Sequence, residues 1–346
     1  MNKKNTFSRL LRHKATPLLI LLIVLSLATM ILSSGVLKGE PLSSLVTNGF
    51  LSKGNLINIF YKLVTQSFMI CGIVLILIGG NMDLSVAGQA GICAMIFAWL
   101  CQNTGIPWYV ILLMAAVMGG LLGLINAFLV NMLKFPPFIA TIGMSTVYGG
   151  FCNILTKGNN IQISQKSIIA LGNAKIAGFL PVTFIIAMIV LIVYQIILSR
   201  TTFGRSLFMC GGNPSAARLS GLNPNKMRRF LFINSGVLAS IGGVLWSAQV
   251  KLASPTALTA SGFDFRVISA AILGGVSFRG GSGSVGGAFI ALLLLNVFEN
   301  MLNILGIQSY WILFASGFLL VVALIIDYLG EERRRKALIM AAASGI

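Results

Sequence analysis

Long apolar runs separated by short polar or Gly/Pro-rich breaks dominate this chain. A run of about twenty apolar residues is long enough to cross a bilayer as a helix. The pattern therefore predicts about ten membrane-spanning helices, of which the run at 264–277 is short for a full crossing. We expect them at 17–37, 55–80, 84–102, 107–131, 136–156, 181–199, 230–250, 264–277, 285–305 and 308–328.

Composition supports this prediction and excludes several classes of protein. The 346 residues are 57% hydrophobic and only 9% charged, which is too little charge for the surface of a soluble protein of this length. We predict an all-α polytopic membrane protein with one transmembrane domain over 17–330, between tails at 1–16 and 331–346. The five cysteines are scattered and the one histidine, His13, lies in the N-terminal tail, so we expect no metal site.

Positive charge predicts an orientation, not a nucleic-acid partner. The net charge is +18, but the basic residues lie at the ends of apolar runs and do not line one face. An even number of spans places the densest clusters, 1–14, 200–229 and 333–336, on one side, which we expect to be the cytoplasm with both termini. The basic N-terminal segment has no small-residue cleavage site after it, so we expect a retained signal anchor.

A polar stretch inside the 200–229 loop predicts a small helix on the cytoplasmic side. Asn213 can cap it, Pro214 suits its first position, and Gly221 can end it in a left-handed conformation. The loop carries six basic residues and no acid, so we expect the helix to press against a soluble partner. The residues expected to make that contact are Asn213, Pro214, Ser215, Ala216, Ala217, Arg218, Ser220 and Gly221.

Three acids, Asp83, Asp264 and Glu299, are expected at or within the spans. We favour Asp83 as the N-cap of the helix at 84–102, where a carboxylate meets the positive end of the helix dipole. The alternative is that Asp83 is a ligand for a substrate or ion, because buried ionisable groups in membranes are often functional. Asp264 is expected to cap the short helix that follows it, with Arg266 as a possible partner.

Glu299 belongs to a polar stripe on one helix face, since helical spacing places Asn296, Asn300 and Asn303 beside it. Such a stripe could line a translocation path or satisfy a subunit interface, and both alternatives stand. The candidate path residues are Asn81, Asp83, Ser85, Gln89, Asn296, Glu299, Asn300 and Asn303. No nucleophile–base arrangement accompanies them, so we expect neither catalysis nor proton-driven pumping by this chain.

Glycines add two observations. The sequence Gly119-Gly120-Leu121-Leu122-Gly123 predicts a close contact between two helices. The passage 278–284 resembles a phosphate-binding loop only superficially, because it lacks the Lys-Ser/Thr ending and follows no soluble strand. We therefore expect no nucleotide site in this chain.

Four stretches of sequence carry a resemblance to a known family. Gly80-Asn81-Met82-Asp83-Leu84-Ser85-Val86 is similar to that family's Gly-Ile-Asp-Leu-Ser-Val-Gly, and Phe138-Ile139-Ala140-Thr141 matches its Phe-Ile-Ala-Thr. Residues 211–223 are similar to its Gly-Gly-Asn-x-x-Ala-Ala-x-x-Ser-Gly-Ile-Asn loop, and 273–306 resembles its C-terminal third. Over roughly 50–330 the chain thus resembles the membrane subunits of bacterial ABC importers for ribose-type monosaccharides, a group that includes autoinducer-2 permeases.

The resemblance implies a type II ABC importer-like permease in the bacterial cytoplasmic (inner) membrane. It implies two cytoplasmic ATPase subunits or one tandem ATPase, a second copy of the permease or a paralogue, and a periplasmic or lipoprotein sugar-binding protein. The partner ATPase would bind ATP, and this chain would bind no cofactor. The helix at 213–222 would be the coupling helix that fits a groove of the ATPase. Besides these proteins, the expected partner is membrane lipid, with no nucleic acid.

Departures from the family pattern leave the solute open. One extra residue separates Gly80 from Asp83, Gln89 follows where small apolar residues are usual, and Arg266 and Glu299 replace other residue types. A nucleoside, a polyol or an autoinducer-2-like solute is an alternative to a pentose or hexose. An ATPase-independent carrier and a scaffold without transport are the rivals from other classes.

Overall fold

The computed structural model describes residues 15–34, 49–260 and 262–315, together with 317, 318, 321, 322, 325, 328 and 332. The segments 1–14 and 333–346 of the expected tails lie outside the described residues. The main helices are α2 (Ala15–Ser33), α4 (Lys53–Ile78), α5 (Val86–Asn103), α6 (Trp108–Asn131), α7 (Pro137–Thr156), α9 (Val182–Arg200), α12 (Pro224–Val250), α14 (Phe263–Leu273) and α15 (Val285–Ile304). Shorter elements are η2 (Gly49–Leu51), α8 (Lys166–Asn173), α10 (Thr202–Gly212), α11 (Pro214–Leu219) and α13 (Ala257–Ala260).

Seven helices of the described part are long and apolar enough to cross a membrane: α4, α5, α6, α7, α9, α12 and α15. The expected polytopic helical bundle is confirmed, whereas the count of ten is not. α14 has only 11 residues, so it is too short for a full crossing. Of the run at 308–328, the structure describes a helix over 309–315 and single positions beyond it. α12 begins at Pro224, six residues before the expected span at 230–250, because Asn223 caps it and Pro224 suits its first turn.

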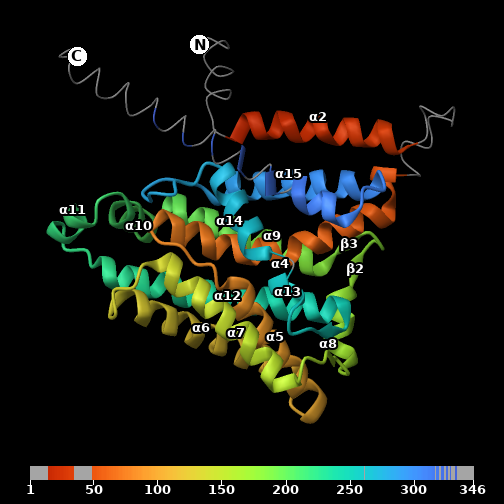
Figure 1. The fold of residues 1–346 in the computed structure, drawn as a ribbon, viewed down its shortest axis with the longest axis horizontal. Coiled ribbons are helices and arrows are strands. Elements are labelled where there is room, and N and C mark those ends of the chain that lie inside the picture. The colour runs from red at the N-terminus through yellow and green to blue at the C-terminus, as the bar shows by residue number, and fades with distance from the viewer. Residues whose placement is uncertain are drawn as a thin grey trace, which may run out of the picture.

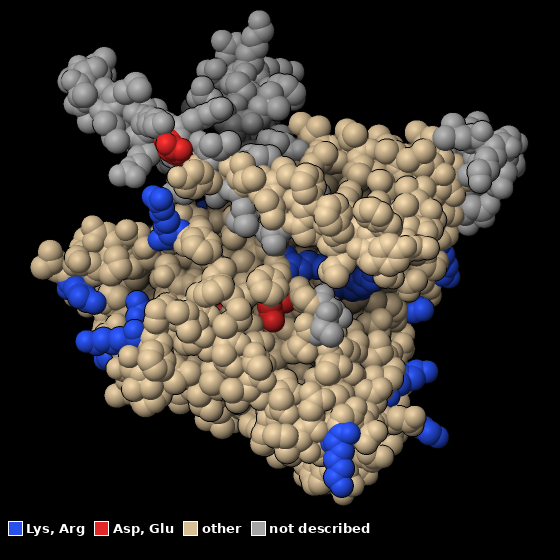
Figure 2. Space-filling model, viewed as in Figure 1, with Lys and Arg blue, Asp and Glu red and all other residues tan. Residues whose placement is uncertain are grey.

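The long helices extend between two distinct ends of the molecule (Figure 1). We call these the α11 end, where α10 and α11 protrude, and the α8 end, where α8 and two short strand pairs lie. Basic side chains gather at both ends, while the broad middle of the face in Figure 2 is uncharged apart from a few charged side chains in a central hollow. This distribution suits a bundle that crosses a membrane between its two charged ends.

α4 occupies the centre of the bundle, and its second half, over 68–78, is apolar on all sides. It packs against α9, α12, α14 and α15, and an unbroken run of its residues from Leu63 to Ile78 is buried. The helices α7 and α9 bury few of their residues and expose large apolar side chains instead. An apolar exposed surface of this kind is suited to contact with lipid.

The glycines at 119–123 allow α6 and α12 to approach closely, as the sequence predicts. A Cβ atom at Gly119 would lie 2.3 Å from the Gly236 carbonyl oxygen, and one at Gly123 would lie 2.1 Å from the Phe232 carbonyl oxygen. Any larger residue would push the two helices apart. These glycines therefore fix the packing of α6 on α12.

The all-α prediction needs one small correction at the α8 end. β1 (Ile161–Gln162) pairs antiparallel with β4 (Leu252–Ala253), and β2 (Lys175–Ile176) pairs antiparallel with β3 (Leu180–Pro181). Pairs of two residues leave no periodicity that a sequence pattern could reveal. The β1–β4 pair ties the connections after α7 and α12 together, and the β2–β3 pair lies within the connection between α8 and α9.

Candidate functional site

α11 forms as the sequence predicts, from local signals alone. The Asn213 side-chain oxygen accepts hydrogen bonds from Ser215 N at 3.1 Å and Ala216 N at 3.0 Å, and Pro214 occupies the first turn. Gly221 ends the helix in a left-handed conformation with φ of 79°. The predicted helix and both of its caps are therefore confirmed, while its role as a coupling helix stays a prediction.

The exposed face of α11 differs from the expected one. Ala217 is fully buried against its own chain, so it supports α11 and does not present its side chain to a partner. Leu219, which is not among the residues expected to make the contact, is 92% exposed. Ala216 and Arg218 remain exposed as expected. The tip of this end therefore offers one isolated leucine among polar and basic residues.

Basic residues surround α11. Arg200, Arg205, Arg218, Lys226 and Arg229 are all exposed there. Arg228 instead turns inward, and its Nη1 atom donates to the Asn131 side-chain oxygen at 3.1 Å, which joins the start of α12 to the end of α6. The surface around α11 would attract an acidic rim on a protein partner.

A network of buried polar side chains surrounds Asp83, in the segment between α4 and α5. Asp83 Oδ1 accepts hydrogen bonds from Ser85 N at 2.9 Å and Ser85 Oγ at 2.5 Å, and Oδ2 accepts one from Ser235 Oγ at 3.3 Å. Ser85 Oγ accepts in turn from Gln89 Nε2 at 2.6 Å and Asn126 Nδ2 at 2.7 Å. All these side chains are buried. The network joins α5, α6 and α12 inside an otherwise apolar bundle, where such bonds specify the packing.

The caps at the start of α5 are arranged differently from the prediction. Asp83 does meet the first turn of α5, but through Ser85, which is the N-cap residue. The N–H of Ala87 is bonded by Asp264 Oδ1 at 2.6 Å, from α14. The prediction that Asp264 caps its own helix is wrong, because Gly262 is the N-cap of α14 and no side chain caps it. Asp264 thus caps a different helix, 177 positions away in sequence.

Two further side chains near this network, Tyr148 and Thr141, were not among the predicted site residues. Tyr148 OH donates one hydrogen bond that is shared between the Leu122 carbonyl oxygen at 3.0 Å and Asn126 Oδ1 at 3.2 Å. Thr141 Oγ1 accepts from Leu84 N at 3.1 Å. The signal available was their position as polar residues within apolar runs. Asn81, in contrast, lies outside the network and bonds the Gly79 carbonyl oxygen at 2.8 Å.

The polar stripe of α15 packs against helices of the same chain. Asn296 Nδ2 donates to Gln66 Oε1 at 2.6 Å. Asn300 and Asn55 exchange two amide hydrogen bonds of 2.9 and 2.6 Å. Both contacts join α15 to α4, so these amides stabilise the bundle whatever other role they have.

Glu299 forms an ion pair of 2.9 Å with Arg266 of α14. Arg266 is therefore the partner of Glu299, and the expected pairing of Arg266 with Asp264 is not formed. Asn303 Nδ2 donates to the Glu299 carbonyl oxygen at 2.8 Å, and its side chain is exposed at the end of α15. Apart from Asn81, the candidate path residues thus lie in two separate networks, one at α5 and one at α15, and their role in a path stays a prediction.

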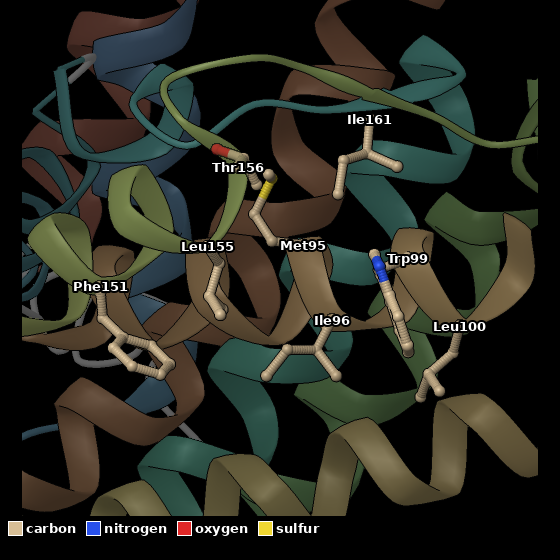
Figure 3. A pocket seen from close by; sticks show the side chains of 8 residues that line it. All are labelled: Met95, Ile96, Trp99, Leu100, Phe151, Leu155, Thr156 and Ile161. Atoms are coloured by element: carbon tan, nitrogen blue, oxygen red, sulfur yellow. The ribbon is translucent and has the colours of Figure 1, made fainter. Parts of the chain in front are cut away.

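A cavity of about 350 Å³ lies between α5, α7 and β1, towards the α8 end (Figure 3). It is lined by Met95, Ile96, Trp99, Leu100, Phe151, Leu155, Thr156 and Ile161. Thr156 is the one polar residue of this lining, and its hydroxyl already donates to the Cys152 carbonyl oxygen at 2.9 Å. The cavity suits an apolar group such as a lipid chain and lacks the hydrogen-bonding groups that a sugar needs.

Comparison with known proteins gives the same family from two directions. The family described as branched-chain amino acid transport system / permease component matches residues 55–324. The chain is 30% identical to the ribose import permease protein of Haemophilus influenzae, over 84% of this chain and 90% of that protein. It is 31% identical to the L-arabinose transport system permease protein of Escherichia coli, over 79% of this chain and 82% of that protein.

A third relative has a different named cargo. The autoinducer 2 import system permease protein of Photorhabdus luminescens is 29% identical, over 83% of this chain and 85% of that protein. No solved structure gives a significant match. The chain belongs to the family of ABC-transporter permease components that includes the ribose, L-arabinose and autoinducer 2 import permeases.

Proposed function

We propose that this chain is the membrane-spanning permease subunit of an ABC importer that translocates a monosaccharide. A separate ATPase drives it from the cytoplasm, and an extracytoplasmic binding protein delivers the sugar. The relatives named for ribose and L-arabinose support a sugar over the amino acids named in the family description. A self-powered carrier is the less favoured alternative.

The observation that carries this proposal is the construction of α11. Six residues are held rigid by a cap at each end and by the buried Ala217, and they present the almost fully exposed Leu219. Exposing a leucine side chain to water is unfavourable, so the rigid presentation of Leu219 on α11 is explained by a partner protein that buries it. A protein that only provides a path through the membrane has no need of this element.

Charge supports placing α11 in the cytoplasm. The described part of the α11 end carries Lys134 and Arg279 in addition to the six basic residues of 200–229, whereas the α8 end carries fewer. Positive-inside bias assigns the richer end to the cytoplasm. In that orientation α11 meets the compartment that holds ATP, and the α8 end meets the binding protein.

Vesicle transport separates the proposal from its rivals. Inside-out vesicles from cells that express the chain with its ATPase and binding protein are loaded with binding protein and radiolabelled ribose or L-arabinose. We expect ATP supplied outside to drive export from the lumen only when the ATPase is present. Movement driven by an ion gradient in vesicles that contain this chain alone would overturn the ABC proposal in favour of a carrier.

Selectivity is tested with the same preparation. The cavity between α5 and α7 is apolar and lacks the hydrogen-bonding groups that a sugar needs, so we propose that the binding protein selects the sugar. Exchanging the binding protein for that of a relative should change which sugar is moved. Unchanged selectivity would place the determinant in this chain.

A further inference from the structure

Glycines join three segments of backbone at the base of α11. We call Gly80, Gly211, Gly280 and Gly281 the glycine clasp. A Cβ atom at Gly211 would lie 1.7 Å from the Ile78 carbonyl oxygen, at the end of α4. One at Gly280 would lie 2.8 Å from the Gly211 carbonyl oxygen and 2.8 Å from Gly80 Cα. The end of α4, the end of α10 and the loop 274–284 are therefore in direct backbone contact.

A hydrogen bond and a tight turn make this contact stiff. The Gly281 N–H donates to the Ile78 carbonyl oxygen at 2.8 Å. The loop folds back on itself through a bond from Ser277 N to the Ser282 carbonyl oxygen at 2.9 Å. Because α11 follows α10 directly, a displacement of α11 acts on the clasp with no flexible linker between them (Figure 1).

α14 extends from the clasp into the bundle. Its C-terminal end leads into the loop 274–284, and its 11 residues span about 16 Å, roughly half the thickness of a hydrocarbon core. At its other end Asp264 bonds the N–H of Ala87, in the first turn of α5. Two residues further along, Arg266 forms the ion pair with Glu299 of α15. A short rigid helix thus connects the clasp with both polar networks.

We propose that α14, held by the glycine clasp at one end and by Asp264 at the other, is the lever that carries a displacement of α11 to the first turn of α5 inside the membrane. This proposal depends on the proposed function in one respect, because it takes the ATPase as the source of the displacement of α11. Rigid elements with bonded ends transmit such movements, whereas loosely packed loops absorb them. The capped start of α5 is then the place where the path responds.

The reactivity of Cys210 tests the lever from its far end. Cys210 precedes the clasp, is 4% exposed, and burial raises the pKa of its thiol, so it should react slowly with a maleimide. The experiment uses the full chain in nanodiscs without an ATPase, with the other four cysteines changed to alanine. We expect Asp264→Ala to speed Cys210 labelling about fivefold, the change equivalent to losing a typical N-cap bond. Asp264→Asn, which keeps an acceptor oxygen, should restore slow labelling.

A matched control removes a comparable contact away from the lever. Thr65 Oγ1 donates to the Gly242 carbonyl oxygen at 3.2 Å between α4 and α12, also across 177 positions. Thr65→Val should leave Cys210 labelling within twofold of the parent chain. The lever is refuted if Asp264→Ala has no effect, or if Thr65→Val has an equal one, because the latter shows a general loosening.

A second pair of variants disturbs the clasp and measures the effect at the start of α5. It also tests the lever if the Asp264→Ala chain does not accumulate in cells. Gly211→Ala places a methyl group against the Ile78 carbonyl oxygen, whereas a Cβ at the adjacent Gly212 meets its nearest atom at 3.6 Å, an ordinary contact. We expect Gly211→Ala, and not Gly212→Ala, to raise hydrogen exchange in the peptide 84–90 at least fivefold. Equal exchange in both variants would overturn the lever while leaving ATPase binding, which is measured separately, untouched.

Discussion

Leu219 provides the sharpest test of the contact between α11 and an ATPase. Its side chain is 92% exposed, so nearly all its apolar surface is available to a partner. Covering a leucine side chain completely stabilises a complex by about 1.5–3 kcal/mol. Truncation to alanine retains one carbon of the side chain, so we take about 2 kcal/mol for the loss. This corresponds to an increase of about 30-fold in the Kd for the ATPase.

The assay is biolayer interferometry with the purified cognate ATPase and the full chain in nanodiscs. Thermal unfolding of Leu219→Ala alone should match the parent chain, because the side chain packs against nothing in its own fold. Leu133 provides the matched control, since it is an exposed leucine at the same end, 48% accessible, but lies outside α11. A change below threefold for Leu219→Ala, or an equal loss for Leu133→Ala, would refute the assignment of α11 as the contact.

Three further predictions concern single contacts. Asn213→Ala should weaken ATPase binding by about fivefold in the same interferometry assay, because losing an N-cap destabilises α11 by about 1 kcal/mol. Asn213→Asp keeps a capping oxygen and should bind like the parent chain. Gly123→Ala should lower the melting temperature in detergent by several degrees, since its Cβ would lie 2.1 Å from a carbonyl oxygen of α12; Gly143→Ala, where nothing lies within 4 Å, should not. Tyr148→Phe should destabilise the chain by about 1–2 kcal/mol, because the buried hydrogen bond that its hydroxyl shares between two acceptors is lost. Equal destabilisation by the exposed Tyr109→Phe would contradict this.

Features that depend on neighbouring residues could be predicted from the sequence. The caps at Asn213 and Gly221 act within a few positions, so α11 was predictable with both of its ends. The apolar runs likewise gave most of the long helices, because hydrocarbon thickness sets their length. The close approach of α6 and α12 followed from glycine spacing, although the partner helix did not.

Features that depend on residues far apart in the sequence could not be predicted from it. Asp264 bonds a helix 177 positions away, and a pattern of neighbouring residues favours a cap on its own helix instead. The choice of Glu299 over Asp264 as the partner of Arg266 likewise depends on how α14 lies against α15. Helical periodicity could not decide which of Ala217 and Leu219 faces outward, because a helix of six residues has too few turns to show an apolar face.

The bond between Asp264 and Ala87 also constrains how the chain is made. α5 is synthesised long before Asp264 leaves the ribosome, so the N–H of Ala87 lacks its final acceptor while the intervening helices are inserted. An unsatisfied backbone group in hydrocarbon costs several kcal/mol. The start of α5 must therefore stay in contact with water or the insertion machinery until α14 arrives, which makes its docking a late step in biogenesis.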